Sequence, residues 1–381
     1  MKKSKLFYAS LIYLICACSL VLLYILSDVL DFSFMSTIAF DIIFAVILQV
    51  GVLFILPLLL FKTFTKQTFK QTFKEFKYTK ISFLSIICAI VIGLGCYFLN
   101  LAIASFFSSI IQLFGYESAP TFASGETTNS ALGLIINLIL VAVLPAICEE
   151  NLHRGMLLSG YATMGIKKAV ILSSLMFGLL HLNVNQFFYT TILGFLIAMT
   201  VVISKSIVPG IIIHFMNNAL SIYLNFATSN KIFGGKVLPW IEKFLTGGNS
   251  ITAFFSSFLF LSCIVGVLLL FYFLLLRESR IKKAQKLFEK ASKIETNAKE
   301  REMLNKLDKN AKPFTNTYIR NLESLNSMIM QYSPKPTMQT AFTIKETKSN
   351  KTTLSEKMLI IGTLVLTVSI TIFTFVWGLL W

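Results

Sequence analysis

Residues 131–154 read ALGLIINLILVAVLPAICEENLHR, and this stretch decides which kind of fold the chain can adopt. Its first 18 residues carry no charge, close to the roughly 20 apolar residues that a helix needs to cross a bilayer. Two adjacent carboxylates, Glu149 and Glu150, then interrupt the run. Ionisable groups are costly inside a membrane, so this pattern indicates a membrane protein with a polar site within the bilayer.

The composition of the whole chain agrees with this interpretation. Of 381 residues, 55% are hydrophobic and only 14% are charged, and the mean hydropathy is +0.75. The formal net charge of +16 falls mostly between apolar runs, which argues against a nucleic-acid partner. The six cysteines lie inside apolar runs without a C-x-x-C pair, so they are expected to be buried residues rather than a zinc site or a disulfide framework.

Apolar runs of about 20 residues recur along the chain, and each can cross a bilayer as a helix. They predict an all-α fold, a polytopic transmembrane helical bundle of about eight or nine spans in the cell membrane. The fifth to seventh spans are short and closely spaced, so their boundaries decide the count. The nine candidates lie near residues 6–27, 37–61, 81–113, 131–160, 169–184, 186–204, 206–226, 250–276 and 358–381.

Lysine in the connections predicts a cytoplasmic N-terminus. The N-terminus carries Lys2, Lys3 and Lys5, and the connection 62–80 carries six further lysines. Alternating spans place these groups on one side of the membrane. The connection 227–249, with three lysines, falls on the other side and departs from the rule.

Residues 277–357 form a basic cytoplasmic insert before the last span, with 18 Lys and Arg against 9 Asp and Glu. Apolar residues recur at helical spacing in 278–310, which predicts either an amphipathic helix on the inner membrane surface or an exposed helix. Residues 311–357 are polar and are expected to be flexible. This insert is where a cytoplasmic or envelope protein partner would bind.

Five parts follow from these patterns. They are N-terminal transmembrane helices in 1–130, a core with intramembrane polar residues in 131–226, a loop and the eighth span in 227–276, the basic segment in 277–357 and a C-terminal transmembrane helix in 358–381.

Intramembrane polar residues gather between positions 149 and 218, a window that holds all three histidines of the chain. Asp41 and Asn100 lie elsewhere, and for each a hydrogen bond between helices is the expected role. The cluster comprises Glu149, Glu150, His153, Arg154, His181, His214, Asn217 and Asn218.

Helical spacing separates the roles of these residues. Glu150 and Arg154 are four apart and can form an ion pair, whereas Glu149 is rotated by about 100° and becomes the candidate base. His153 either bonds Glu149 or faces the lipid headgroups.

A second set of polar residues lies on the later spans. His214 and Asn218 share one helix face, and Asn217 is expected to point elsewhere. Glu149, His181 and His214 fall at similar depth in three helices, which predicts that they meet in one pocket.

Such a pocket suits the hydrolysis of a peptide bond. A carboxylate and imidazoles can activate water, and His and Asn can donate to an oxyanion. Alternatively Glu149, His181 and His214 could hold a zinc ion, although no H-E-x-x-H is present. The chain also lacks the G-x-S-x-G of serine hydrolases.

Three motifs in this window resemble the CPBP family of intramembrane proteases, also called the CAAX protease or Abi family. Residues 149–154 resemble its E-E-x-x-x-R motif, 177–181 its F-x-x-x-H motif and 214–218 its H-x-x-x-N motif. One departure is His153, where the family commonly has an aromatic residue.

The resemblance implies that Glu149 is the general base, that His181 helps to hold the catalytic water, and that His214 with Asn218 forms the oxyanion site. Glu150 and Arg154 would brace the helix. It implies a membrane-embedded peptide or protein substrate, cut near the cytoplasmic leaflet.

Two rival functions remain at this stage. One is a non-proteolytic scaffold or bacteriocin self-immunity protein of the same fold, favoured by the basic insert. The other is a proton-coupled carrier, because buried Glu and His also serve proton relays.

Overall fold

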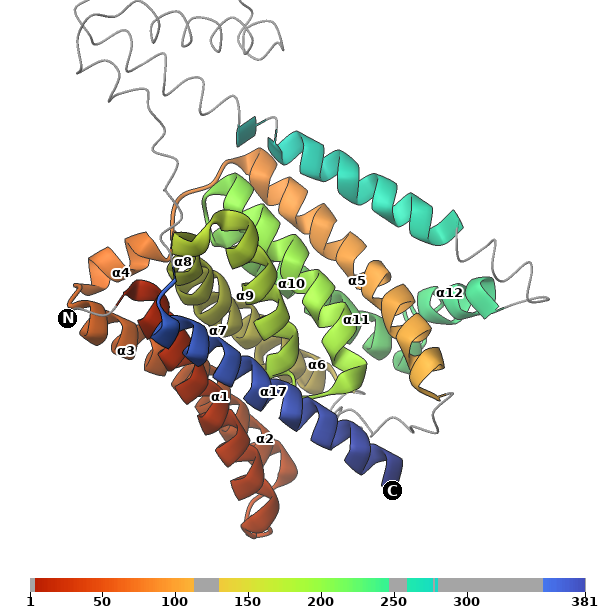
Figure 1. The fold of residues 1–381 in the computed structure, drawn as a ribbon. Helices are drawn as coiled ribbons and strands as arrows, with labels where there is room; N and C mark the ends of the chain where they lie inside the picture. The colour runs from red at the N-terminus through yellow and green to blue at the C-terminus, as the bar shows by residue number, and fades with distance from the viewer. Residues whose placement is uncertain (1–3, 113–129, 247–258, 277, 280–351, 381) are drawn as a thin grey trace, which may run out of the picture. The chain divides into compact units, whose positions relative to one another are not determined.

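The computed structural model describes residues 4–112, 130–246, 259–276, 278–279 and 352–380, and within them it contains helices and connections but no strand (Figure 1). The all-α fold class is therefore confirmed. The predicted helix over 278–310 and most of the flexible stretch 311–357 lie outside the described residues. Contacts divide the chain into two units, residues 1–272 with 349–381 and residues 273–348.

Residues 5–112 form four helical rods. These are α1 (Lys5–Val29), the continuous rod α2 (Thr37–Ala45), η1 (Val46–Ile55) and α3 (Leu56–Thr65), the short α4 (Phe69–Glu75), and α5 (Phe83–Gln112). The segment η1 is a π-helix, in which each backbone hydrogen bond spans five residues instead of the four of an α-helix. Hydroxyl side chains cap the N-termini of α1, α2 and α4. Ser4, Ser36 and Thr68 each accept a hydrogen bond from a backbone N–H of the first turn.

The polar core begins with a long rod from Ala131 to Met164. Its successive parts are α6 (Ala131–Asn137), the π-helix η2 (Leu138–Val143), α7 (Leu144–Glu150), the π-helix η3 (Asn151–Leu157), α8 (Leu158–Tyr161) and the 3₁₀ turn η4 (Ala162–Met164). The helices α9 (Ile166–Leu180), α10 (Val184–Ser204), α11 (Val208–Asn230) and α12 (Val237–Thr246) follow. A helix at Leu259–Leu276 and α17 (Leu354–Leu380) complete the described elements.

Seven of the described helical rods are long and apolar enough to cross a membrane, which makes the chain a multi-pass membrane protein. The predicted fifth and seventh spans correspond to α9 and α11, which are helices but are not among these seven. With 15 residues, α9 is shorter than the thickness of a bilayer requires. The seven rods are Lys5–Val29, Thr37–Thr65, Phe83–Ala104, Ala131–Met164, Val184–Ser204, Leu259–Leu276 and Leu354–Phe373.

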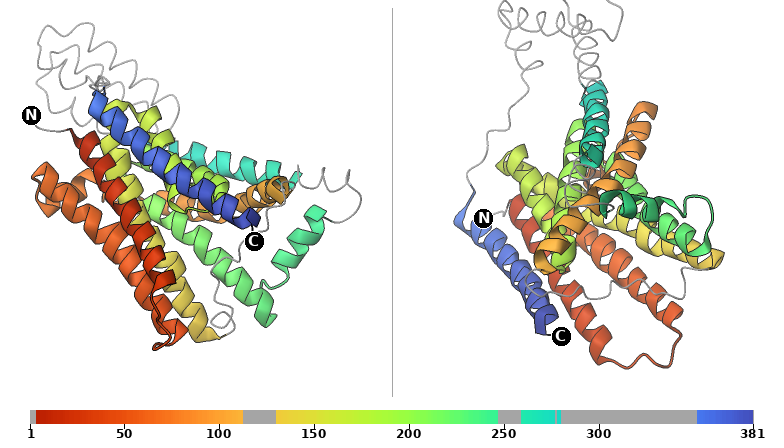
Figure 2. Two further views of the ribbon diagram at one scale, coloured as in Figure 1. Left: turned by 60° about the horizontal axis from the view of Figure 1, so that its bottom comes forward. Right: turned by 90° about the vertical axis from the view of Figure 1, so that its right-hand side faces the viewer.

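Within the first unit, α5, α10 and α11 pack against one another, and α9 packs along α10 (Figure 1). The rod that contains α7 lies between α11 and η1, and α17 runs beside α1 (Figure 2). Helices far apart in the sequence thus surround α7, which carries the two adjacent glutamates.

Candidate active site

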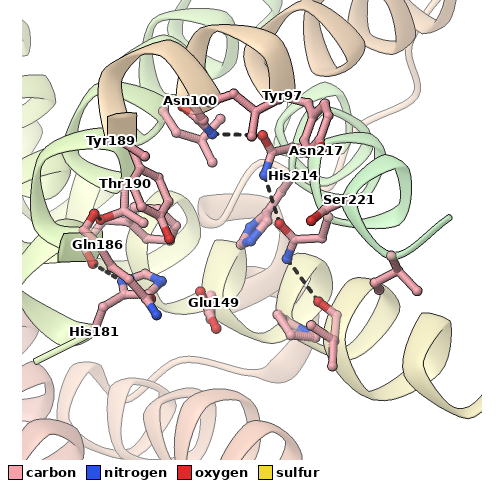
Figure 3. Close-up of a pocket in the computed structure, with 18 of the residues that line it drawn as sticks. Tyr97, Asn100, Glu149, His181, Gln186, Tyr189, Thr190, His214, Asn217 and Ser221 are labelled. Carbon is pink, nitrogen blue, oxygen red and sulfur yellow. Dashed lines mark hydrogen bonds between the residues drawn. The ribbon is translucent and has the colours of Figure 1, made fainter. Parts of the chain in front are cut away.

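A cavity of about 550 Å³ opens among these helices and is lined by the polar residues of the core (Figure 3). The lining residues of α5, α10 and α11 recur three, four and seven positions apart, so each helix turns one face to the cavity. These faces consist of Tyr97, Asn100, Leu101 and Ala104 on α5, Gln186, Tyr189, Thr190 and Leu193 on α10, and His214, Asn217, Asn218, Ser221 and Ile222 on α11. The predicted meeting of Glu149, His181 and His214 in one pocket is therefore confirmed.

Glu149 lies on α7 at the floor of this cavity, with only 9% of its surface exposed. Its Oε1 accepts a hydrogen bond of 3.0 Å from Nε2 of Gln49, which is 8% exposed on η1. Sequence reasoning missed Gln49, although an amide in the middle of the apolar run 37–61 was a usable signal. The bond fixes one carboxylate oxygen, and the structure gives Oε2 no partner within the described residues.

The predicted ion pair between Glu150 and Arg154 is present and completely buried. Nη1 of Arg154 lies 2.9 Å from Oε1 of Glu150, and both side chains are fully inaccessible. Nη2 donates to the carbonyl of Gly194 on α10 at 2.8 Å. A Cβ at position 194 would lie 3.1 Å from Nη2, so glycine makes room for the guanidinium. Arg154 thereby ties α10 to the rod that bears both glutamates.

Glu150 has a second partner that the sequence did not reveal. Its Oε1 also lies 3.0 Å from Nδ1 of His214 on α11. A carboxylate only accepts, so Nδ1 carries the proton, and Nε2 is the ring nitrogen left for the cavity. Glu150 thus orients His214 as well as bracing its own helix.

His181 is held in the same way by its own helix. It caps the end of α9, and its Nδ1 donates to the carbonyl of Phe177 at 2.9 Å. The neutral ring therefore presents the bare Nε2 as an acceptor. Leu182, with φ of +51°, turns the chain away immediately afterwards.

Phe177 packs against the three histidines and Arg154, a role that the motif pattern alone did not assign. Its ring makes edge contacts with His153, His181 and His214 at centroid distances of 5.0, 5.2 and 5.6 Å. The Arg154 guanidinium lies 4.5 Å from the ring centroid, a favourable cation–π geometry. One aromatic side chain thus fixes the positions of the site histidines relative to the ion pair.

The expectation that Asn217 points elsewhere is wrong. Asn217 lines the cavity, where its Oδ1 accepts from Nδ2 of Asn100 at 2.8 Å and its Nδ2 donates to Oδ1 of Asn218 at 2.9 Å. Residues three positions apart still face the same side of a helix, so Asn217 joins the face of His214. The interhelical hydrogen bond expected for Asn100 is confirmed, but Asn100 belongs to the site.

Asn218 ends this row of amides at the backbone of η2. Its Nδ2 donates to the carbonyl of Val141 at 2.9 Å. In an α-helix that carbonyl would bond the N–H of residue 145, which is a proline and has none. Asn218 therefore has a fixed orientation and keeps one N–H for the cavity.

Of the two positions predicted for His153, the structure shows the hydrogen bond to Glu149 and not a place among the headgroups. It is fully buried, and its Nδ1 bonds the backbone carbonyl of Glu149 at 2.8 Å rather than the carboxylate. Its ring packs on Tyr13 and Phe177 and does not line the cavity. The aromatic ring thus fills the place of the aromatic residue that the motif usually has.

The end of α7 is also tied to a connection outside the membrane spans. The hydroxyl of Tyr78 donates to Oδ1 of Asn151 at 3.2 Å. Burial raises the pKa of Tyr78, so the hydroxyl stays protonated and remains a donor.

The geometry does not fit a metal ion. Among the described residues, no three His, Cys, Asp or Glu side chains gather closely enough to hold one. The three side chains considered for zinc therefore share the cavity without forming a ligand set.

Residues 131–220 match the model of the family described as type II CAAX prenyl endopeptidase Rce1-like. The comparisons with curated proteins and with solved structures gave no match. The matched segment contains all three motifs and contributes most of the cavity. The resemblance to the CPBP family is thereby confirmed for this part of the chain.

Proposed function

We propose that this protein is an intramembrane endopeptidase that uses Glu149 to activate water against a peptide bond of a membrane-associated substrate. The observation that carries the proposal is the geometry of the cavity. Glu149 is the lining residue that bears a carboxylate, and it faces His181 and His214 there (Figure 3). The family match supports the same class of reaction.

The attacking water would be held between Glu149 and His181. Oε2 of Glu149 and Nε2 of His181 are both acceptors, so each can take one O–H of the same water. The oxygen lone pair then points away from both groups, toward the substrate carbonyl. Glu149 removes one proton as the water oxygen bonds to carbon.

Asn218 and His214 would stabilise the oxyanion that forms. Asn218 has one N–H left after its bond to Val141. Because Nδ1 of His214 donates to Glu150, its Nε2 can donate only when the ring is an imidazolium. The Glu150 carboxylate stabilises that charge. Loss of a single oxyanion donor typically lowers kcat by about 10²- to 10³-fold.

The reaction closes when Glu149 passes its proton to the leaving nitrogen. The C–N bond then breaks, and the products are a carboxylic acid and an amine. The proposed reaction takes no step through a metal ion.

The direct test compares protein and peptide termini in native cells that carry either the wild-type protein or Glu149→Gln. The amide keeps the shape of the side chain and removes the base. Asp41→Asn is the matched control, since Asp41 lies in a span but does not line the cavity. We expect new termini in the wild-type and control cells that disappear with Glu149→Gln at equal abundance. Identical termini in all three would refute the proposal and favour a binding role.

A further inference from the structure

Three asparagine side chains form a continuous row of hydrogen bonds along the wall of the cavity (Figure 3). Nδ2 of Asn100 on α5 donates to Oδ1 of Asn217 on α11 at 2.8 Å, and Nδ2 of Asn217 donates to Oδ1 of Asn218 at 2.9 Å. Nδ2 of Asn218 then donates to the carbonyl of Val141 on η2 at 2.9 Å. Every bond runs the same way, from an amide nitrogen to an oxygen, so the row has a direction.

The Val141 carbonyl sets that direction. A carbonyl oxygen only accepts, so Nδ2 of Asn218 faces it, and Oδ1 of Asn218 faces Asn217. Asn217 must therefore offer its own Nδ2 to Asn218, which leaves its Oδ1 toward α5. Only a donor fits at that end of the row, and Asn100 supplies it.

The direction of the row decides what Asn218 presents to the cavity. In the observed orientation Nδ2 of Asn218 keeps a second N–H, and an N–H stabilises an oxyanion. In the reversed orientation Oδ1 would take the place of Nδ2, and an oxygen repels an oxyanion. An amide that accepts at its oxygen also becomes a stronger donor at its nitrogen, because hydrogen bonds in a chain polarise one another. The bond from Asn100 therefore acts on the N–H of Asn218 through Asn217.

Of the two polar atoms of the Asn100 side chain, only the donor has a partner within the described part of the chain. The side chain is 7% exposed, and its Oδ1 is buried there without a hydrogen bond. A buried acceptor without a partner is unfavourable, so the donor is the part of Asn100 that the site uses. Position 100 lies outside residues 131–220, and the family model does not cover it.

We infer that Asn100 is a positioning residue of the oxyanion site. Through Asn217 it fixes the amide of Asn218, so that an N–H and not an oxygen faces the substrate. The role rests on the proposed function, which assigns Asn218 to the oxyanion. It goes beyond the packing of α5 against α11, because Asn100 then affects the rate of the reaction through the donor strength and the orientation of Asn218.

The first test measures cleavage by the full-length protein in lipid nanodiscs. The substrate is a fluorogenic peptide with the sequence around a terminus that depends on Glu149 in cells. Asn100→Leu keeps a side chain of similar size and removes the donor. We expect kcat to fall about five- to tenfold at unchanged KM, the loss typical of one hydrogen bond. Asn230→Leu is the matched control, since Asn230 bonds a carbonyl of its own helix and does not line the cavity. An unchanged kcat in Asn100→Leu would overturn the inference.

A double-mutant cycle separates positioning from packing. Asn218→Ala removes the oxyanion donor and should lower kcat by about 10²- to 10³-fold. Because Asn100 acts through Asn218, Asn100→Leu should have no further effect on kcat in the Asn218→Ala protein. A packing role would lower kcat by the same factor in both backgrounds, and that result would overturn the inference.

Thermal unfolding in detergent distinguishes failure of this inference from failure of the proposed function. If no terminus depends on Glu149, the proposed function fails, and the unfolding midpoints of the wild type, the two single variants and the double variant become the deciding measurement. Asn100 and Asn218 are linked only through Asn217. A midpoint loss in the double variant that is smaller than the sum of the single losses supports the positioning of Asn218 by Asn100. Additive losses overturn it.

Discussion

Gln49 determines which oxygen of Glu149 faces the substrate, because its amide bonds Oε1 and leaves Oε2 for the water. Gln49→Leu keeps a side chain of similar size and removes the donor. Hydrogen bonds to charged groups contribute about 1.5–3 kcal/mol, so we expect proteolysis to fall by roughly 10- to 100-fold at unchanged abundance. This fall in proteolysis is measured as the rate at which Glu149-dependent protein and peptide termini appear in the cells.

Asn225→Leu is the control for this change. Asn225 is exposed on α11, bonds only a carbonyl of its own helix and does not line the cavity. If the Gln49→Leu protein cleaves its substrates as fast as the Asn225→Leu protein, Gln49 does not position the base.

Glu150 is expected to act on stability as well as on the charge of His214. Its Oε1 serves both Arg154 and His214, and all three side chains are buried. Glu150→Gln leaves Arg154 charged without a counter-ion, and breaking a buried pair costs about 3–5 kcal/mol. We expect a large drop in the unfolding midpoint in detergent and in abundance, with Asp41→Asn unchanged. A wild-type midpoint would mean that Arg154 has another counter-ion.

For individual residues, spacing along one helix predicted contacts within that helix but did not predict partners on other helices. The pair Glu150–Arg154 was predictable because residues four apart are neighbours by geometry alone. The partners of Gln49, Asn100 and His214 lie 100, 117 and 64 positions away in the chain. No periodicity reports which faces of different helices meet.

The π-helices explain a further limit at the scale of the elements. Each of η1, η2 and η3 alters the phase of the rod that contains it, so the fixed angle per residue fails over long stretches. The length of the apolar runs in the sequence was enough to predict that these rods exist. Their internal breaks, two of which precede Pro57 and Pro145, decide where Gln49 and Glu149 point.

The packing of α5 on α11 depends on Gly93. A Cβ there would lie 2.7 Å from Cβ of Met216 and 2.8 Å from the Ile213 carbonyl, both beside His214. Gly93→Ala must therefore push the two helices apart, at a cost of about 1–3 kcal/mol. We expect a lower unfolding midpoint and reduced proteolysis, since Asn100 would also move away from Asn217.

Gly362 on α17 provides a matched control, because nothing lies within 4 Å of a Cβ at that position. Gly362→Ala should stabilise the helix slightly, by up to about 1 kcal/mol. Equal effects of the two substitutions would show that the close approach of α5 and α11 is not what Gly93 supplies.

Over the whole molecule, several contacts bring the basic ends of the helices to one face. Lys5 binds both carboxylate oxygens of Glu75 at 2.7 Å, and the backbone N–H of Ile207 donates to the carbonyl of Lys77 at 3.0 Å. Ser4 bonds Glu356 at the start of α17. The N-terminus, the connection after α3, the loop before α11 and the start of α17 thus share one side, as the lysine pattern predicts.

That this side is the cytoplasm is a prediction from the excess of lysine. A cytoplasmic start of α17 also places the basic segment 277–357 inside the cell, where it could bind a protein partner. Orientation can be measured without knowing the substrate. Single cysteines at Asp31 and Lys70, both exposed, are introduced after the six native cysteines are replaced by alanine.

Asp31 follows the far end of α1, which at about 1.5 Å per residue is long enough to cross the bilayer from Ser4. In intact cells a membrane-impermeant maleimide should label Asp31→Cys, and it should label Lys70→Cys only after the membrane is opened. The opposite pattern would invert the topology and put the basic segment outside. Equal labelling at both sites in intact cells would contradict a membrane crossing by the rod Thr37–Thr65, which lies between the two positions in the sequence.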